Sequence, residues 1–138
     1  MTKDAFGAVV DALARRDLTS VELERRLARA GYEPDACADA IARAAAAGYL
    51  DDDRVALERA RRLSERGASN TAIRTELVQR GMSDEAVTSA LEPLPSESER
   101  AERLAHKLGG GLRAARALAR KGYPEDVVER VLRLDIAE

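Results

Sequence analysis

Apolar residues in this chain recur in a pattern that is copied three times with the same internal spacing. In each copy two apolar residues lie four positions apart, a glycine follows after four more, and a further apolar residue comes ten positions later. The copies are Leu23, Leu27, Gly31 and Ile41; Ile73, Leu77, Gly81 and Leu91; and Ala114, Leu118, Gly122 and Leu132. A four-residue spacing is typical of one face of a helix, and glycine commonly ends a helix in the left-handed conformation. The pattern therefore predicts a repeated unit in which one helix ends at the glycine and another follows.

Each of these glycines precedes residues that favour the start of a helix. A capping residue or a proline comes first, and acids occupy the first turn, where the helix dipole stabilises them. The three starts are Glu33-Pro34-Asp35, Ser83-Asp84-Glu85 and Pro124-Glu125-Asp126. The same register extends backwards to Leu13, Leu63 and Leu104, each near the end of an earlier amphipathic stretch. Each copy is therefore predicted to contain three helices.

The helical periodicity and the capping residues together predict the boundaries of these elements. The predicted helices cover residues 4–15, 20–30, 34–48, 52–66, 70–80, 84–91, 96–108, 111–121 and 124–134. We interpret the chain as an all-α protein of three tandem three-helix repeats, at 1–50, 51–95 and 96–138. The proline-containing segment 92–96 is the predicted linker, and the glycines at 109–111 form a second flexible point. Because one such repeat buries little surface, the repeats are expected to stack into an elongated, curved array.

The amino-acid composition agrees with this fold and limits the cellular compartments in which we expect the protein. Aromatic residues make up only 3% of the chain and tryptophan is absent, whereas strong helix formers are abundant. The lone Cys37 excludes an internal disulfide, so a reducing compartment is the simplest environment. The N-terminus lacks the apolar core of a signal peptide, and no stretch approaches the roughly 20 apolar residues of a membrane span. We therefore expect a cytoplasmic protein without a membrane partner.

Charged residues are abundant, and arginine carries most of the positive charge. The formal net charge is −2, from 23 basic and 25 acidic residues, so the placement of the charges matters more than their sum. The planar guanidinium group suits carboxylate and phosphate partners. We predict basic ridges in the second and third repeats that contact a partner protein or, alternatively, single-stranded or duplex DNA. The candidate residues are Arg59, Arg62, Arg66, Arg74, Arg80, Arg113, Arg116, Arg120 and Lys121. The other interpretation of each ridge is a solvated helix face whose arginines pair with neighbouring acids.

The segment from Gly48 to Asp52 is the most distinctive short motif. Gly48 is predicted to end a helix, Tyr49 and Leu50 to pack, and Asp51 or Asp52 to cap the next helix. The acids here lack the glycine-broken loop and the distant glutamate of a calcium site. Elsewhere no Cys/His cluster has metal-ligand spacing, so no metal is expected.

The sequence also lacks a recognisable catalytic constellation. His106 has no serine, cysteine or carboxylate in helical register that would make it a general base, and it is predicted to lie on the surface. Cys37 shares a face with Ala40 and is predicted to be a small buried hydrophobe. The glycines at 109–111 lack the preceding strand and the lysine of a phosphate-binding loop. We therefore expect a binding protein without catalytic residues, cofactor or small-molecule substrate.

Several of these segments together resemble the RecX family of recombination regulators. The segments are Ser20, Glu22-Leu23 and Arg26-Leu27, then Gly48-Tyr49-Leu50-Asp51-Asp52-Asp53-Arg54-Val55-Ala56, then Gly67-Ala68-Ser69 and Glu76-Leu77 with Arg80-Gly81. The resemblance is strong over residues 8–91 and weaker in the third repeat. It implies a regulatory protein that docks along the RecA filament on single-stranded DNA. Inhibition of RecA recombinase, ATPase and co-protease activity is implied as well, and with it an influence on homologous recombination, DNA repair and the SOS response.

Two other functions are compatible with the repeat pattern. Each repeat pairs two short helices around a tight turn, as a helix-turn-helix DNA-binding regulator does. The candidate recognition helices begin with acids, however, and negative charge at that end opposes approach to phosphates. The remaining alternative is a helical adaptor that has no DNA-related function.

Overall fold

The computed structural model describes the backbone of residues 3–137 and the side chains of residues 3–134, and within this range the chain forms nine helices and no strand. In chain order these are α1 Ala5–Arg15, α2 Ser20–Arg29, α3 Pro34–Ala46, α4 Asp52–Glu65, α5 Asn70–Gln79, α6 Asp84–Leu91, α7 Glu97–Lys107, α8 Gly111–Arg120 and α9 Glu125–Ala137. The all-α prediction is therefore confirmed. Each predicted helix is present, and the largest difference is that α9 extends to Ala137 because no breaker follows position 134.

Side-chain caps define most of the helix starts. Thr19 forms a capping box with Glu22 at the start of α2, whereas the Ser69 side chain caps α5 by accepting a hydrogen bond from the backbone N–H of Ala72. The helix α8 differs, because its N-cap residue is Gly110, which offers no side-chain acceptor. At the other ends the predicted glycines adopt the left-handed conformation, with φ of 90° at Gly81.

The buried side chains form three clusters, each within one group of three consecutive helices. We call α1–α3 the first unit, α4–α6 the second and α7–α9 the third. Their cores are centred on Leu23 and Leu27, on Ile73 and Leu77, and on Leu118. Every helix pair in extensive contact belongs to a single unit. The cores fall inside the ranges predicted for the repeats, whereas the exact domain boundaries stay a prediction.

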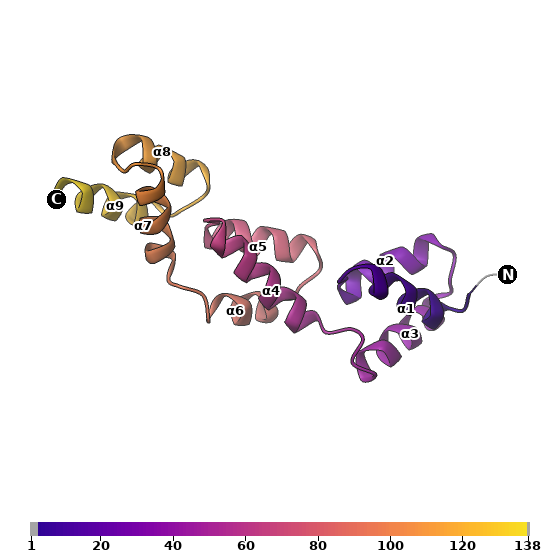
Figure 1. Ribbon diagram of the computed structural model, residues 1–138. Coiled ribbons are helices and arrows are strands. Elements are labelled where there is room, and N and C mark those ends of the chain that lie inside the picture. The colour runs from indigo at the N-terminus through magenta and orange to yellow at the C-terminus, as the bar shows by residue number, and fades with distance from the viewer. Residues whose placement is uncertain (1–2, 138) are drawn as a thin grey trace.

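The three units follow one another in a row, as Figure 1 shows. The chain exposes 8805 Å² to solvent, whereas a compact protein of 15.0 kDa would expose about 7,000 Å². The difference reflects an elongated arrangement in which each unit contacts only its neighbour. Such a shape presents a long surface, and the contacts between units determine how the surfaces of the three units are oriented relative to one another.

Candidate partner-binding surface

Two of the predicted contact residues form ion pairs inside the protein. Arg59 of α4 donates from Nε and Nη2 to the two carboxylate oxygens of Glu76 in α5, and both side chains are about 30% exposed. The hydrogen bond from Arg59 lowers the pKa of Glu76. Arg80 donates to Glu22, with an Nη2–Oε1 distance of 2.9 Å. Arg59 therefore forms a contact within the second unit, and Arg80 forms a contact between the first and second units. Neither side chain lies on an open basic ridge.

The pair between Arg80 and Glu22 belongs to a joint between the first and second units. At this first joint the N-terminus of α2 meets the C-terminus of α5. The Thr19 hydroxyl donates to the carbonyl oxygen of Arg80 at 2.6 Å, and the Ser20 N–H donates to Oδ1 of Asp52 at 2.8 Å. Nearby, Arg54 reaches back to Asp17 with an Nη2–Oδ1 distance of 3.0 Å, and this hydrogen bond lowers the pKa of Asp17.

The same joint is repeated between the second and third units. Here the N-terminus of α5 meets the C-terminus of α8: the Ser69 hydroxyl donates to the carbonyl oxygen of Lys121 at 2.9 Å. The Asn70 N–H donates to Oε2 of Glu97 at 2.6 Å, just as Ser20 donates to an acid at the start of α4. The sequence repeat therefore encodes the contacts between units as well as the units themselves.

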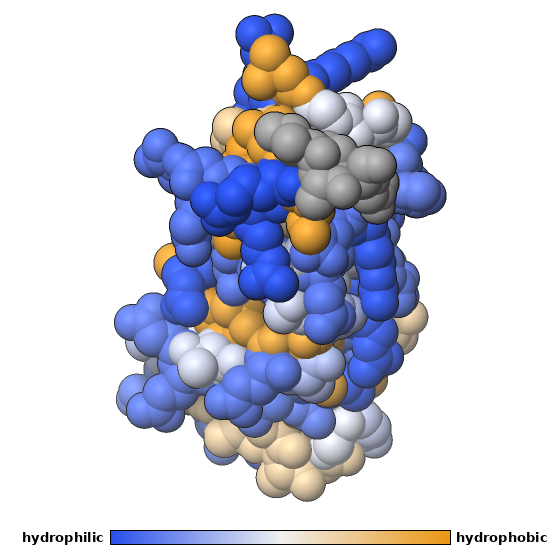
Figure 2. All heavy atoms as spheres, turned by 90° about the vertical axis from the view of Figure 1, so that its left-hand side faces the viewer, coloured by the Kyte–Doolittle hydropathy of each residue, from blue (hydrophilic) through white to orange (hydrophobic). Residues whose placement is uncertain are grey.

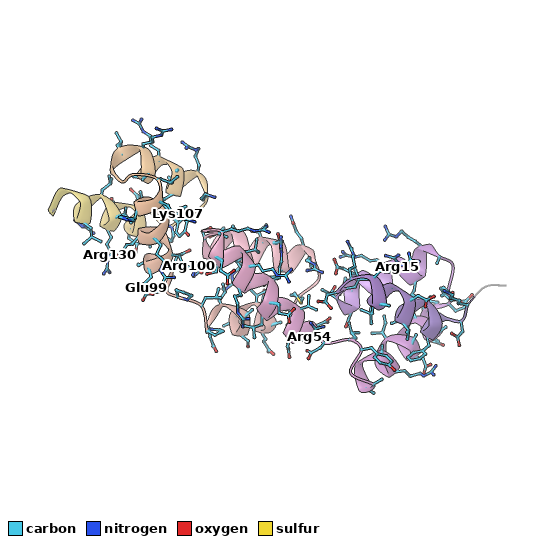
Figure 3. All side chains as sticks on the ribbon, in the orientation of Figure 1. Arg15, Arg54, Glu99, Arg100, Lys107 and Arg130 are labelled. Carbon is cyan, nitrogen blue, oxygen red and sulfur yellow. The ribbon has the colours of Figure 1, made fainter. Side chains whose placement is uncertain are left out.

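A buried arginine completes this second joint. Arg100 is only 4% exposed, and its guanidinium donates to the carbonyl oxygens of Pro95 and Ala68 and to Oδ1 of Asn70. The Tyr123 hydroxyl donates to the carbonyl oxygen of Gly67 at 2.7 Å, and burial raises the pKa of this tyrosine. Figure 3 shows Arg100 between the second and third units. Sequence reasoning did not find this role, because Arg100 lies among charged residues that suggest a solvated helix face.

The other predicted basic residues are exposed. Arg62 and Arg66 lie one turn apart at the end of α4, and Arg74 lies on α5. Arg113, Arg116 and Arg120 share one face of α8, which Lys121 follows. None of these seven side chains forms an ion pair with another described residue. They lie on consecutive units, and we call the three residues of the second unit the α4–α5 area and the four of the third unit the α8 area.

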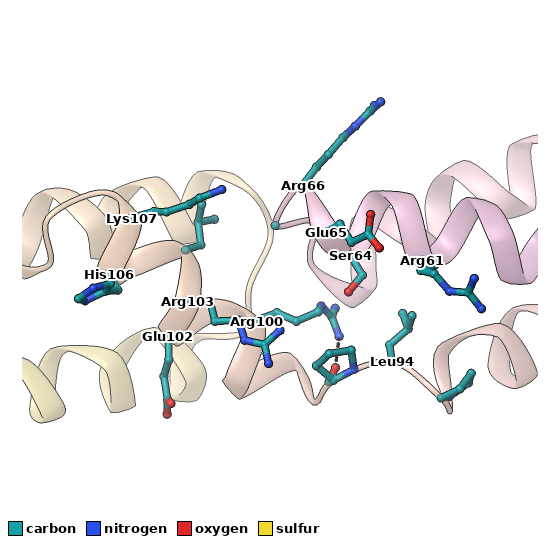
Figure 4. A pocket seen from close by; sticks show the side chains of 14 residues that line it. Arg61, Ser64, Glu65, Arg66, Leu94, Arg100, Glu102, Arg103, His106 and Lys107 are labelled. Carbon is teal, nitrogen blue, oxygen red and sulfur yellow. Dashed lines mark hydrogen bonds between the residues drawn. The ribbon is translucent and has the colours of Figure 1, made fainter.

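A groove lies between the second and third units, close to the end of α4. It has a volume of about 780 Å³, and its lining comes from α4, from the linker at 93–95 and from α7. Figure 4 shows basic side chains from both units around it. Three of these, Arg61, Arg103 and Lys107, were not among the predicted contact residues, although a helical spacing of four between the last two was visible in the sequence. We call this cavity the inter-unit groove.

The Gly48–Asp52 motif has the predicted structural role with one correction. Gly48 has φ of 80°, Leu50 is buried, and Asp51 caps α4 by accepting from the Arg54 N–H. Tyr49 was predicted to pack together with Leu50, but its side chain is 55% exposed. Its ring lies beside that of Phe6, with the ring centroids 6.5 Å apart.

The remaining predictions about single residues concern chemistry. Cys37 is buried and His106 is exposed, as predicted. Among the residues that the structure describes, no group of His, Cys, Asp and Glu is placed to hold a metal ion.

No helix within residues 3–137 has the length and hydrophobicity to cross a membrane. Figure 2 views the molecule from the third unit, where hydrophilic residues cover most of the surface and smaller hydrophobic areas lie between them.

The pair between Arg80 and Glu22 predicts a pH-dependent contribution to stability. We expect Arg80→Ala to lower the free energy of unfolding by about 1–3 kcal/mol at pH 7, because a half-buried carboxylate loses its charged partner. Burial tends to raise the pKa of Glu22, but hydrogen bonds from Arg80 and Thr19 outweigh it, and the pKa is lowered from 4.5. A lowered carboxyl pKa means stability that is present above 4.5 and lost as the pH falls below it.

Urea unfolding at pH 7 and at pH 3 checks this prediction. The difference between Arg80→Ala and the parent should be smaller at the lower pH, because protonation of Glu22 weakens the ion pair as the pH falls below 4.5. Arg74→Ala is the control, because Arg74 is exposed and forms no ion pair among the described residues, and it should change stability by less than about 0.5 kcal/mol. An equal loss at both pH values would contradict the electrostatic role of the pair.

The architecture defines an all-α helical-repeat protein with exposed basic residues on its second and third units. Comparison with known proteins specifies this class: a family model described as RecX, first three-helix domain, matches residues 5–43. Regulatory protein RecX of Xanthomonas oryzae pv. oryzae (strain PXO99A) is 31% identical over 136 residues, which cover 91% of this chain and 84% of the relative. Its counterpart from Stenotrophomonas maltophilia (strain R551-3) is also 31% identical, with coverage of 89% and 82%. The chain belongs to the RecX family of regulatory proteins.

Solved structures support the same fold. The crystal structure of RecX from Lactobacillus salivarius has a TM-score of 0.80 and 20% sequence identity, and the match covers 96% of this chain and 95% of that one. A second crystal structure of regulatory protein RecX has a TM-score of 0.76 at 20% identity, over 92% of this chain and 69% of that one. The arrangement of helices is therefore shared at low sequence identity.

Proposed function

We propose that this protein binds the RecA filament on single-stranded DNA and inhibits RecA, and that it thereby modulates homologous recombination, DNA repair and the SOS response. Membership in the RecX family of regulatory proteins is the observation that carries this proposal. The choice of RecA as the partner rests on the resemblance of the sequence to the RecX family.

The surface of the protein is suited to this role. A filament offers the same binding features repeatedly along its length, and the α4–α5 and α8 areas are basic surfaces on consecutive units. The second joint holds these two units in a defined alignment, so we expect both areas to contact one extended partner at once. Exposed arginines can bind acidic protein groups or phosphates, and occupation of the filament in this way would hinder ATP hydrolysis and strand exchange.

The helix-turn-helix alternative is less well supported. The third helix of each unit would have to enter the major groove with its N-terminal end. Acids occupy the first turn of each of these helices: Asp35 in α3, Asp84 and Glu85 in α6, and Glu125 and Asp126 in α9. Their carboxylates would face the phosphate backbone, which is unfavourable.

ATP hydrolysis by RecA on single-stranded DNA tests the proposal. We expect the protein to slow hydrolysis. A variant in which five arginines are replaced by glutamate should lose this effect. The residues reversed are Arg62, Arg66, Arg113, Arg116 and Arg120. Arg59 and Arg80 stay unchanged, because a glutamate in their place would lie beside Glu76 or Glu22 and destabilise the fold.

The matched control reverses exposed arginines of the first unit, Arg25 and Arg29 in α2. This variant should inhibit RecA as the parent does, and circular dichroism should show that both variants remain helical. If the parent leaves RecA activity unchanged over a wide concentration range but binds a specific duplex tightly, the helix-turn-helix alternative is correct.

A further inference from the structure

The inter-unit groove combines an apolar floor with a basic rim. Leu94 and Pro95 of the linker and Leu104 of α7 supply aliphatic surface, and the groove has the volume of a typical ligand site at about 780 Å³. Basic residues come from both sides, Arg61 from α4 and Arg103 and Lys107 from α7 (Figure 4). The site therefore exists only because the second joint holds the two units side by side.

The charge of the groove is unbalanced. Arg100 also lines it, but its guanidinium is occupied by hydrogen bonds within the joint. Arg61, Arg103 and Lys107 are exposed and form no ion pair among the described residues. Of the two lining carboxylates, that of Glu102 lies 3.7 Å from Arg130, which leaves Glu65 as the main local anion. A ligand with carboxylates would complement the remaining positive charge.

The chemistry of the floor distinguishes a protein ligand from a nucleic acid. Unstacked bases bind on aromatic side chains, but no Phe, Tyr or Trp lines this groove. Its surface of leucine and proline instead suits an aliphatic side chain. An acidic peptide can place its charges near the rim and its apolar residue on the floor.

We propose that the inter-unit groove binds an acidic protein segment that carries one aliphatic anchor. The anchor lies against Leu94 and Leu104, and flanking carboxylates pair with Arg61 and Arg103. This inference goes beyond the proposed function and does not depend on it, because the recognition is a property of the groove and any partner with such a segment could use it.

Fluorescence anisotropy with a synthetic peptide tests the groove on the intact protein. The probe is a short labelled peptide of glutamate and serine residues with a single central leucine. We expect it to bind the parent, and Arg61→Glu combined with Arg103→Glu to raise its Kd by about tenfold or more, because rim charges would then repel it. Replacing the central leucine of the peptide by serine should raise the Kd to a similar extent, about tenfold, since burial of the leucine is lost.

Two controls separate this site from a general charge effect. Arg25→Glu combined with Arg29→Glu reverses two exposed arginines of α2 outside the groove and should leave the Kd unchanged. Oligo(dT) of similar charge should bind more weakly than the peptide. The proposal is overturned if the peptide does not bind the parent, or if the groove reversal leaves the Kd of the peptide unchanged in a variant that remains helical. It is also overturned if oligo(dT) binds more tightly than the peptide and the same reversal abolishes that binding. RecA is absent from this assay, so its result is independent of the proposed function.

Discussion

Replacing Leu77 by alanine is expected to lower the free energy of unfolding by about 2–5 kcal/mol. Leu77 is fully buried in the core of the second unit, so truncation removes apolar contacts and leaves a cavity. Leu27 and Leu118 occupy the same position in the other two units, and both are at most 3% exposed. Their alanine variants should therefore lose a similar amount of stability.

Urea unfolding followed by circular dichroism measures these losses. Leu112→Ala is the matched control, because Leu112 is 56% exposed and its truncation should cost less than about 0.5 kcal/mol. The cores of the first and third units are separate clusters, so the effects of Leu27→Ala and Leu118→Ala should add in the double variant. A core variant that unfolded like the parent would show that its unit does not depend on this leucine.

The second large effect is expected for Gly81→Ala at the first joint. The residue has φ of 90°, which disfavours any side chain by about 1–2 kcal/mol. A Cβ atom here would also overlap with the side chain of Val21 in the first unit. Relief of this overlap has to move the units apart and stretch the hydrogen bond between Thr19 and Arg80. We expect a total loss of about 2–5 kcal/mol, since overpacking adds about 1–3 kcal/mol to the backbone strain.

Gly31 provides a closely matched control for this prediction. It ends α2 as Gly81 ends α5, with φ of 94°, but no atom lies within 4 Å of the position of an added Cβ. Gly31→Ala should therefore carry only the cost of backbone strain, about 1–2 kcal/mol. Urea unfolding of both variants gives the difference. Equal losses would mean that close contact at Gly81 contributes nothing to the joint.

The fold was predictable from the sequence because the repeat specifies it several times over. The spacing of Leu23, Leu27 and Gly31 gives the helical face and the helix end together, and the copies repeat that information. Local capping residues then position the boundaries. Such short-range signals depend on neighbours in the chain, so they are visible without a structure.

The partners of individual arginines were not predictable in this way. Arg80 pairs with Glu22, 58 residues away, and only the packing of one unit on the next brings them together. The charged neighbours of Arg100 suggest a solvated helix face, yet the second joint buries it. The helical spacing of Arg113, Arg116 and Arg120 did indicate a shared face, because that depends on α8 alone. Their contact with a partner stays a prediction.

The polar character of the joints bears on how cooperatively the chain unfolds. Extensive helix packing is confined to the units, whereas the joints rest mainly on hydrogen bonds, ion pairs and small contact areas. In a nearest-neighbour description, the stability of the array is the sum of three intrinsic terms and two coupling terms. Weak coupling allows an end unit to open while its neighbour stays folded. The middle unit takes part in both couplings, so its loss would leave the first and third units as independent bodies connected only by chain.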